Sequence, residues 1–292
     1  MYFFNQFFVI AILILFGGLI WAALDFWRLG KAITRPISQQ SAITYTGIPT
    51  IFIHGYRGNR YSFGRMLHRF YKLGAAQKTL VIKIAADGTW KTNGNWVFEQ
   101  NNPCIQVLFC KNTADVSQQV QWLTPLMAAL KAKGVTTVNL VGHSMGAVTA
   151  VAYCAQALTA SQPKIAKVVT IAGPFNDLEL GKDTAEILSY PLTKDGPQRT
   201  TPIYEYLQQH MAQVPYPIKF LNLVGNILPN SRVQHDGSVA TSSGLSLKYI
   251  LMQTPHIYHQ AVLRGANAAH SLLHENSLVD WNIIEFLWRP SK

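Results

Sequence analysis

The sequence predicts an α/β protein built on a mainly parallel β-sheet with helices on both of its faces. From residue 48 onwards, stretches rich in β-branched and apolar residues alternate with stretches of helical period, which is typical of a layered α/β structure. Several strand-like stretches are apolar at nearly every position, as expected where helices cover both faces of a sheet. The chain has 292 residues, 49% of them hydrophobic, which is enough for a sizeable core.

Strands are expected wherever a short apolar run is bounded by turn residues, at residues 49–54, 79–85, 104–109, 136–142, 166–173, 218–225 and 260–266. Helices are expected over the intervening amphipathic stretches, at residues 62–73, 113–133, 145–160, 241–251 and 278–288. We expect Ser277 to cap the last helix, with Asp280 as its partner in a capping box.

Residues 1–23 are expected to lie outside the folded domain. This segment carries no charged residue and is long enough to cross a bilayer as a helix. Trp21 and Trp27, near its end, suit a membrane interface. A transmembrane anchor is favoured over a cleavable signal peptide, because no basic residue precedes the apolar run and no clear cleavage site follows it. Residues 24–47 are interpreted as a linker and residues 48–292 as the folded domain.

The charge distribution favours a membrane surface over nucleic acid as a partner. Lys and Arg number 25 against 14 Asp and Glu, a net charge of +11, but the basic residues form no long run and no stripe with aromatic residues. Arg28, Lys31 and Arg35 follow the apolar segment, which by the positive-inside rule would leave the domain in the cytoplasm. The three cysteines indicate no metal site, and we expect no metal or organic cofactor.

A serine between two glycines stands at the end of a predicted strand, in the sequence VNLVGHSMGAV at residues 138–148. A strand, the pattern G-x-S-x-G and a helix together are typical of a nucleophile elbow, in which the serine takes a strained backbone conformation with positive φ. Gly142 and Gly146 would remove the side chains that collide with such a turn. Ser144 is therefore the candidate nucleophile.

Two backbone amides are candidates for stabilising a developing oxyanion. The Met145 N–H follows the candidate nucleophile at the start of a helix, where amides are unpaired. The second donor should come from the loop after an earlier strand, and the Tyr56 N–H follows His54-Gly55 at the end of the strand at 49–54. We interpret His54 as a structural residue of this turn rather than as a base.

The general base and its acid are expected after the serine in chain order. His270 directly follows the strand-like run 260–266 and is the favoured base, with His274, one helical turn later, as the alternative. Asp236 is the favoured acid, because it is the acidic residue of the stretch after the strand at 218–225, and Asp236-Gly237 forms a turn. Asp177, after the preceding strand, is the second choice.

Taken together, these stretches resemble a group of bacterial α/β hydrolases, mostly from Gram-positive sources, whose substrate is unassigned. The resemblance is carried by FIHGYRGNRYSFGRM (52–66), NPCIQVLF (102–109), VNLVGHSMGAV (138–148), HDGSVATSSGLSLKYIL (235–251) and HSLLHENSLVD (270–280). It implies a lipase-like α/β-hydrolase fold, serine hydrolysis of esters, and the triad Ser144, Asp236 and His270. Arg57 and Ala147 depart from the family pattern, which often has a small residue and a third glycine at these positions.

The predicted function is hydrolysis of a carboxylic ester through an acyl-enzyme, with a small-molecule or lipid-like substrate. A thioesterase or peptidase with the same triad is the nearest alternative, and a non-catalytic, membrane-tethered binding module is a third. The resemblance slightly favours an extracellular domain, anchored or secreted. The basic residues that follow the apolar segment favour the cytoplasm instead.

Residues 174–217 form a long, proline-rich connection between two strands, which is interpreted as a lid-like insertion. Its apolar residues either bind an acyl chain or pack the lid on the domain, and the sequence leaves these alternatives open; they are Phe175, Ile203, Tyr204, Tyr206 and Met211.

Overall fold

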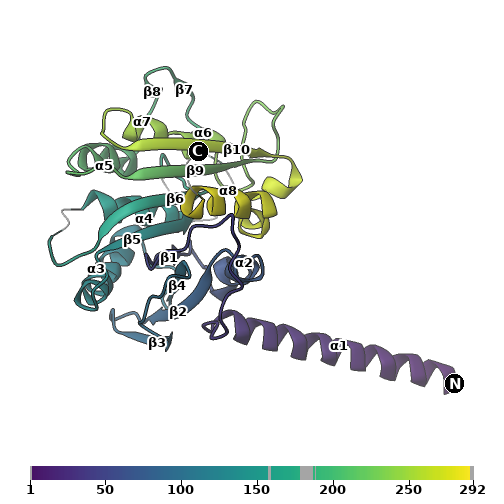
Figure 1. The fold of residues 1–292 in the computed structure, drawn as a ribbon. Coiled ribbons are helices and arrows are strands. Elements are labelled where there is room, and N and C mark those ends of the chain that lie inside the picture. Colours follow the sequence, from purple (N-terminus) through teal and green to yellow (C-terminus); the bar gives the residue numbers. More distant parts are fainter. Residues whose placement is uncertain (1, 157–158, 178–186, 188, 290–292) are drawn as a thin grey trace.

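The computed structural model describes residues 2–156, 159–177, 187 and 189–289. In this part of the chain a sheet of eight strands runs through the domain in the order β10-β9-β6-β5-β1-β4-β2-β3 (Figure 1). Neighbouring strands are parallel except for β3, which pairs antiparallel with β2 at one edge. The strands are β1 (Thr50–Ile53), β2 (Gln77–Ile84), β3 (Trp90–Gly94), β4 (Pro103–Phe109), β5 (Thr137–His143), β6 (Lys164–Ile171), β9 (Lys219–Asn226) and β10 (Ile257–Arg264).

Helices cover both faces of this sheet, so two cores form. Alternation along β1 shows why: Ile51 and Ile53 belong to one buried cluster, whereas Phe52 belongs to the other. The first cluster is covered by α3 (Val116–Ala132), α4 (Met145–Ala155), α5 (Pro202–Met211) and α7 (Leu247–Leu251). The second is covered by α2 (Arg60–Lys72) and α8 (Ser277–Trp288). The predicted mainly parallel α/β class is confirmed.

The differences from the predicted elements have local causes. Strand β3 was not expected, because its sequence WKTNG is polar and mostly exposed and carries no apolar pattern. The helix expected at 241–251 consists of two short helices, α6 (Thr241–Leu245) and α7, with Ser246 between them. Helix α4 ends at Ala155 rather than at residue 160.

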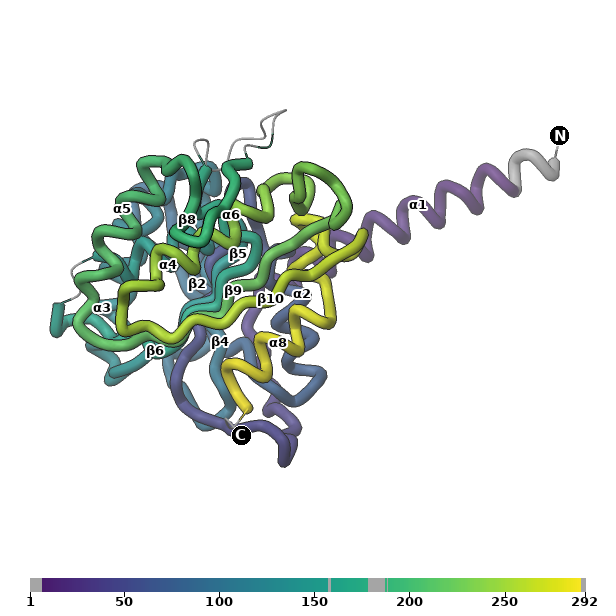
Figure 2. Tube along the Cα trace, turned by 90° about the horizontal axis from the view of Figure 1, so that it is seen from above, coloured from purple at the N-terminus to yellow at the C-terminus, as the bar shows by residue number. Residues whose placement is uncertain are grey.

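Helix α1 (Tyr2–Leu29) projects away from the domain (Figures 1 and 2). Its part Phe7–Leu29 contains an 18-residue window with a mean hydropathy of 2.8 and is long and apolar enough to cross a membrane. The helix continues six residues beyond the apolar segment expected at 1–23, and its last turn packs on the domain. There Leu29 is buried against Gly64 of α2.

The segment after α1 follows the surface of the domain as an irregular strap. Ile33 N–H donates to the Lys78 carbonyl at 2.7 Å, and Thr44 N–H donates to the Trp288 carbonyl at 2.7 Å. Asn102 fixes the strap further, because its Nδ2 donates to the Thr44 carbonyl at 2.9 Å. Residues 24–47, expected to be a linker, therefore comprise the end of α1 and this hydrogen-bonded strap.

The long connection 174–217 is described in part, since residues 178–186 and 188 lie outside the described residues. It contains a small hairpin of β7 (Leu192–Thr193) and β8 (Gly196–Pro197), followed by α5. Phe175, Tyr204 and Met211 are buried in the first core, whereas Ile203 and Tyr206 are partly exposed. The first three residues thus pack this connection on the domain.

Candidate active site

Ser144 occupies a strained turn between β5 and α4. Its backbone has φ 56° and ψ −130°, an unusual conformation for a residue with a side chain, and its N–H donates to the Ile171 carbonyl at 2.8 Å. A Cβ at Gly142 would overlap the Gly146 carbonyl oxygen, and one at Gly146 would overlap the Ile53 carbonyl oxygen. Both glycines are therefore required for the turn, for the steric reason that the sequence predicts.

The loop after β1 approaches Ser144 closely. A Cβ on Gly55 would lie 2.8 Å from the Ser144 Cβ, so only a glycine fits there. The Gly58 N–H closes a turn on the Gly55 carbonyl at 3.0 Å, and the Arg57 N–H donates to the Asn112 carbonyl at 2.8 Å. Arg57 has φ 52°, a backbone conformation that glycine adopts without strain and that a residue with a side chain rarely takes.

Two backbone amides adjoin the residues that meet at this turn, Gly55 and Ser144. Within the described residues, neither the Tyr56 N–H of this turn nor the Met145 N–H at the start of α4 donates a hydrogen bond. These are the two donors expected from the sequence.

His54 stabilises the same loop. Its Nδ1–H donates to the Gly55 carbonyl at 2.8 Å, and its Nε2 accepts from the Phe109 N–H at 3.0 Å. Burial lowers the pKa of His54 to about 4, so the ring is neutral at pH 7. Because both ring nitrogens are engaged with backbone groups, these contacts agree with a structural role.

The structure brings Ser144, His270 and Asp236 together in one hydrogen-bonded chain. His270 lies in the 3₁₀ helix η2 (His270–Glu275), after β10 and the short 3₁₀ helix η1 (Ala266–Ala268). Its Nε2 is 2.9 Å from the Ser144 Oγ, and its Nδ1 is 2.8 Å from the Asp236 Oδ2. With Nδ1–H donating to the carboxylate, Nε2 is left to accept the proton of the serine hydroxyl.

Asp236 serves two partners with its two carboxylate oxygens. The Oδ1 accepts from the Ser238 N–H at 2.9 Å and from the Val239 N–H at 2.7 Å, while Oδ2 faces His270. Gly237 has φ 102°, which allows this sharp turn. The side chain is only 1% exposed, so the carboxylate is held by protein groups rather than by water. The acid beside His270 is thus Asp236, not Asp177.

His143, which precedes the nucleophile, was not singled out from the sequence. It is buried, and its Nε2–H donates to the His270 carbonyl at 2.9 Å. Its ring stands between those of His270 and His274, with centroids 4.8 and 4.9 Å away. Burial, then the charges of these two histidines, hold the pKa of His143 well below its usual range. A neutral His143 therefore supports the backbone of His270. The variable position inside G-x-S-x-G gave no signal for this role.

Across the residues that the structure describes, His274, the alternative base, makes no hydrogen bond with Ser144, whose Oγ faces His270 instead. The His274 Nδ1 lies 3.6 Å from the Glu275 Oε1, beyond hydrogen-bonding distance, and the side chain is only 13% exposed. Its ring packs edge-on against His143, so this residue is packed on the domain rather than solvated.

Arg69 of α2 anchors the segment that carries both histidines. Its guanidinium donates to the His274 carbonyl, to Glu275 and to both carboxylate oxygens of Asp280. The predicted Ser277–Asp280 capping box is therefore wrong. Asn276 caps α8 by accepting from the Leu278 N–H, and Asp280 is engaged by Arg69.

Within the described part of the chain, no three His, Cys, Asp or Glu side chains cluster in a way that could hold a metal ion. The chemistry available at the site is that of a serine hydroxyl, an imidazole, a carboxylate and two backbone amides.

Comparison with known proteins agrees with this architecture. Residues 37–290 match a family described as alpha/beta hydrolase of unknown function (DUF915). A lin2722 gene product from Listeria innocua has a similar crystal structure, with 27% identity, a TM-score of 0.72, and coverage of 82% of this chain and 93% of that one. A proposed cell surface hydrolase from Lactobacillus plantarum WCFS1 is also similar, with 21% identity, a TM-score of 0.64, and 82% and 91% coverage. No functionally curated protein matches the sequence.

Proposed function

Because the chain belongs to this family of alpha/beta hydrolases, we propose that it is a serine hydrolase that cleaves carboxylic esters through an acyl-enzyme. The observation that carries the proposal is the chain of hydrogen bonds from Ser144 through His270 to Asp236, at 2.9 and 2.8 Å. A nucleophile, a base and an orienting acid at hydrogen-bonding distance form the arrangement with which triad hydrolases carry out acyl transfer.

In the proposed reaction, His270 Nε2 takes the hydroxyl proton as the Ser144 Oγ attacks the ester carbonyl carbon. Asp236 holds the ring in the required tautomer and stabilises the imidazolium that forms. The imidazolium then protonates the departing alkoxide, which leaves an acyl group on Ser144. A water molecule, deprotonated by the same imidazole, hydrolyses this acyl-enzyme and restores the serine.

The Tyr56 and Met145 amides are proposed to stabilise the tetrahedral oxyanion. Preorganised donors of this kind contribute about 10²–10³ each to kcat in serine hydrolases. The turn hydrogen bond from Gly58 and the Arg57 bond to Asn112 hold the first amide in place, and the helix α4 holds the second.

The contacts of α1 support a membrane anchor rather than a cleaved signal. Asp25 is buried and forms salt bridges with Arg28 at 2.9 Å and with Arg65 of α2 at 3.3 Å. Leu29 is buried against α2 as well. Because the end of the helix is built into the domain, its removal would expose the surface of α2 that it covers.

A lipid-like ester is the proposed substrate class, since the candidate site lies near the anchor along the chain. The loop with Tyr56 leads directly into α2, whose first residues contact α1. Arg60 donates to the Phe26 carbonyl at 3.1 Å, and the Tyr61 hydroxyl donates to the Ala22 carbonyl at 3.4 Å. Few residues therefore separate the oxyanion loop from the helix that we expect in the bilayer.

Hydrolysis of a p-nitrophenyl ester series from acetate to palmitate tests the ester proposal. The full chain in neutral detergent should cleave these esters, and Ser144→Ala should reduce kcat by several orders of magnitude with unchanged Tm. If all esters remained intact while an acyl-thioester or a peptide was cleaved, the thioesterase or peptidase alternative would replace it. No turnover of any of them would favour a binding module.

A further inference from the structure

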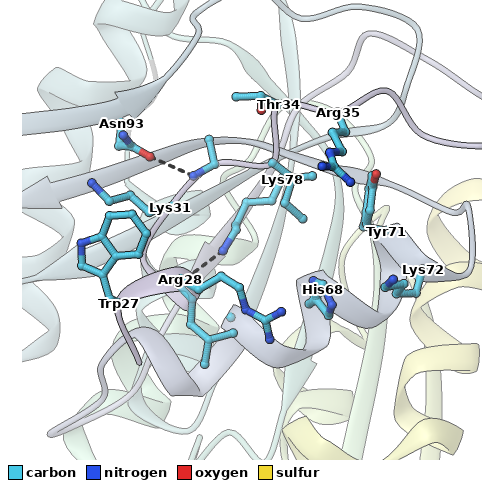
Figure 3. A pocket seen from close by; sticks show the side chains of 14 residues that line it. Trp27, Arg28, Lys31, Thr34, Arg35, His68, Tyr71, Lys72, Lys78 and Asn93 are labelled. Carbon is cyan, nitrogen blue, oxygen red and sulfur yellow. Dashed lines mark hydrogen bonds between the residues drawn. The ribbon is translucent and has the colours of Figure 1, made fainter. Parts of the chain in front are cut away.

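A cavity of about 630 Å³ lies where α1 meets the domain, apart from the candidate active site (Figure 3). Its walls come from the last turn of α1, the strap 31–35, α2, β2 and β3. None of the residues that line it takes part in the serine, histidine and aspartate cluster. The cavity is therefore a separate feature of the junction between helix and domain.

The lining of the cavity is strongly basic. Among the described residues that form it, none carries a carboxylate, whereas five carry a positive charge: Arg28, Lys31, Arg35, Lys72 and Lys78. The carboxylate beside it, Asp25, is engaged by Arg28 and Arg65. Like charges held around one hollow repel each other and create a positive potential that an anion would relieve.

Lys78 is a buried cation in the wall of the cavity. It is 2% exposed, and its Nζ donates to the Leu29 carbonyl at 2.8 Å and to the Gln106 Oε1 at 3.4 Å. Burial, then the nearby Arg28, lowers the pKa of Lys78 to about 8, so the ammonium is mostly charged at pH 7. Two neutral oxygens satisfy two of its three protons, and a buried ammonium without a carboxylate is stabilised by any anion that enters.

Basic side chains from different parts of the chain converge on this space. Figure 3 shows Lys78 between the strap with Lys31 and Arg35 and the helix α2 with Lys72. Tyr71 lines the same wall near Arg35 and Lys72 and adds a hydroxyl. Arg35 and Lys72, which come from two segments, lie on the same side of Lys78, so an anion on that side of the cavity would be near both of them, while Lys31 lies beside Trp27 on the other side.

We propose that this cavity binds the phosphate of an anionic phospholipid headgroup. The inference rests on the proposal that α1 spans the membrane. Trp27 is exposed at the end of the apolar helix, with the Lys31 ammonium 4.9 Å from its ring centroid, an arrangement typical of the membrane interface. Lipid phosphates lie at this level of a bilayer, and Leu29 and Ile33 offer an apolar wall for the adjoining glycerol and acyl carbons.

Binding of short-chain lipids to the full chain tests the proposal. The Ser144→Ala protein in neutral detergent is titrated with ether-linked dioctyl phosphatidylglycerol, with the matching phosphatidylcholine and with sodium phosphate. The ether linkage prevents hydrolysis, and native mass spectrometry or the shift in Tm gives the Kd. We expect saturable binding of phosphatidylglycerol at least tenfold tighter than that of the other two ligands, weakened by added salt.

Arg35→Gln and Lys72→Gln, two exposed cations of the cavity, should each weaken phosphatidylglycerol binding about tenfold. Lys83→Gln is the matched control, because Lys83 is an exposed lysine of β2 outside the cavity and should leave the Kd unchanged. In chains that retain Ser144, Lys72→Gln should also leave hydrolysis of p-nitrophenyl acetate unchanged, which separates this proposal from the proposed function.

Three results would overturn the proposal. Equal affinity for phosphatidylglycerol and phosphatidylcholine would mean that the charge of the headgroup is not recognised. Phosphate binding as tight as phosphatidylglycerol binding would identify a site for a soluble anion. An equal loss in Lys83→Gln and Lys72→Gln would show attraction by net charge rather than by the cavity.

Discussion

Replacement of Asp236 by Asn separates two roles of this carboxylate, which accepts from two backbone amides and orients the ring of His270. The asparagine Oδ1 can keep accepting from the Ser238 and Val239 amides, which places its Nδ2 toward His270. An amide nitrogen donates, so the His270 Nδ1 must become an acceptor and the ring proton moves to Nε2. The nitrogen that faces the Ser144 Oγ then carries a proton and cannot act as a base.

The expected loss of activity follows from this change of tautomer. In a serine protease triad the corresponding Asp→Asn change reduces kcat about 10⁴-fold, and we expect about 10³–10⁴ here, equal to about 4–5 kcal/mol of activation free energy. The assay is kcat for a p-nitrophenyl ester, with Tm measured on the same samples. A folded Asp236→Asn protein that retained more than about a tenth of wild-type kcat would refute the role of Asp236.

Asp236→Ala is the matched variant that tests the structural role. It removes both hydrogen bonds to backbone amides, each worth about 1.5–3 kcal/mol when the acceptor is charged. We expect a loss of about 3 kcal/mol, or roughly 6–12 °C in Tm, whereas Asp236→Asn should lose only about 1 kcal/mol because neutral hydrogen bonds remain. Equal destabilisation by the two variants would contradict this division of roles.

Three further predictions concern groups around the site. Arg69→Met should lower the free energy of unfolding by about 3 kcal/mol, because it leaves Asp280 buried without a cation. A thermal melt measures this loss, and an unchanged Tm would contradict the anchoring role of Arg69. The free energy of unfolding should fall by about 3 kcal/mol from His54 alone as the pH drops from 6.5 towards 4. The reason is that the folded pKa of His54, about 4, lies below its unfolded value, because burial disfavours the charged ring and a protonated Nε2 would face the Phe109 N–H. Urea melts across this range check it, and the pH dependence should weaken in His54→Asn. His143→Phe should reduce kcat about fivefold, because it removes a hydrogen bond of about 1 kcal/mol to the backbone of the base, and KM should be unchanged. A change in KM alone would argue against a positioning role.

Most of the fold could be predicted because the buried strands carry a strong local signal. Strands β1, β4 and β5 lie between helices on both faces of the sheet, and their sequences are apolar at most positions, which predicts this buried environment. The edge strand β3 gave no such signal, since it is held by backbone pairing to β2 while its side chains face solvent. The break at Ser246 was also missed, because the helical period of the apolar residues continues across a one-residue interruption.

The elements of the candidate site were predictable where backbone geometry demands a particular residue. Gly142 and Gly146 follow from the sterics of the turn around Ser144, and chain order pointed to Asp236 and His270, whose catalytic roles stay predictions. Supporting contacts could not be found in this way. His143 and Arg69 act through segments more than a hundred residues distant in sequence, and neither stands in a local pattern that reveals its partner.

Labelling with a fluorophosphonate probe tests the proposed nucleophile most directly, because the probe reacts with activated serines and needs no knowledge of the substrate. Intact-mass analysis of the full chain should show one adduct per molecule, mapped by peptide sequencing to Ser144, and none in a folded Ser144→Ala protein. An unlabelled folded wild type, or equal labelling of the two proteins, would contradict the proposed serine-hydrolase mechanism.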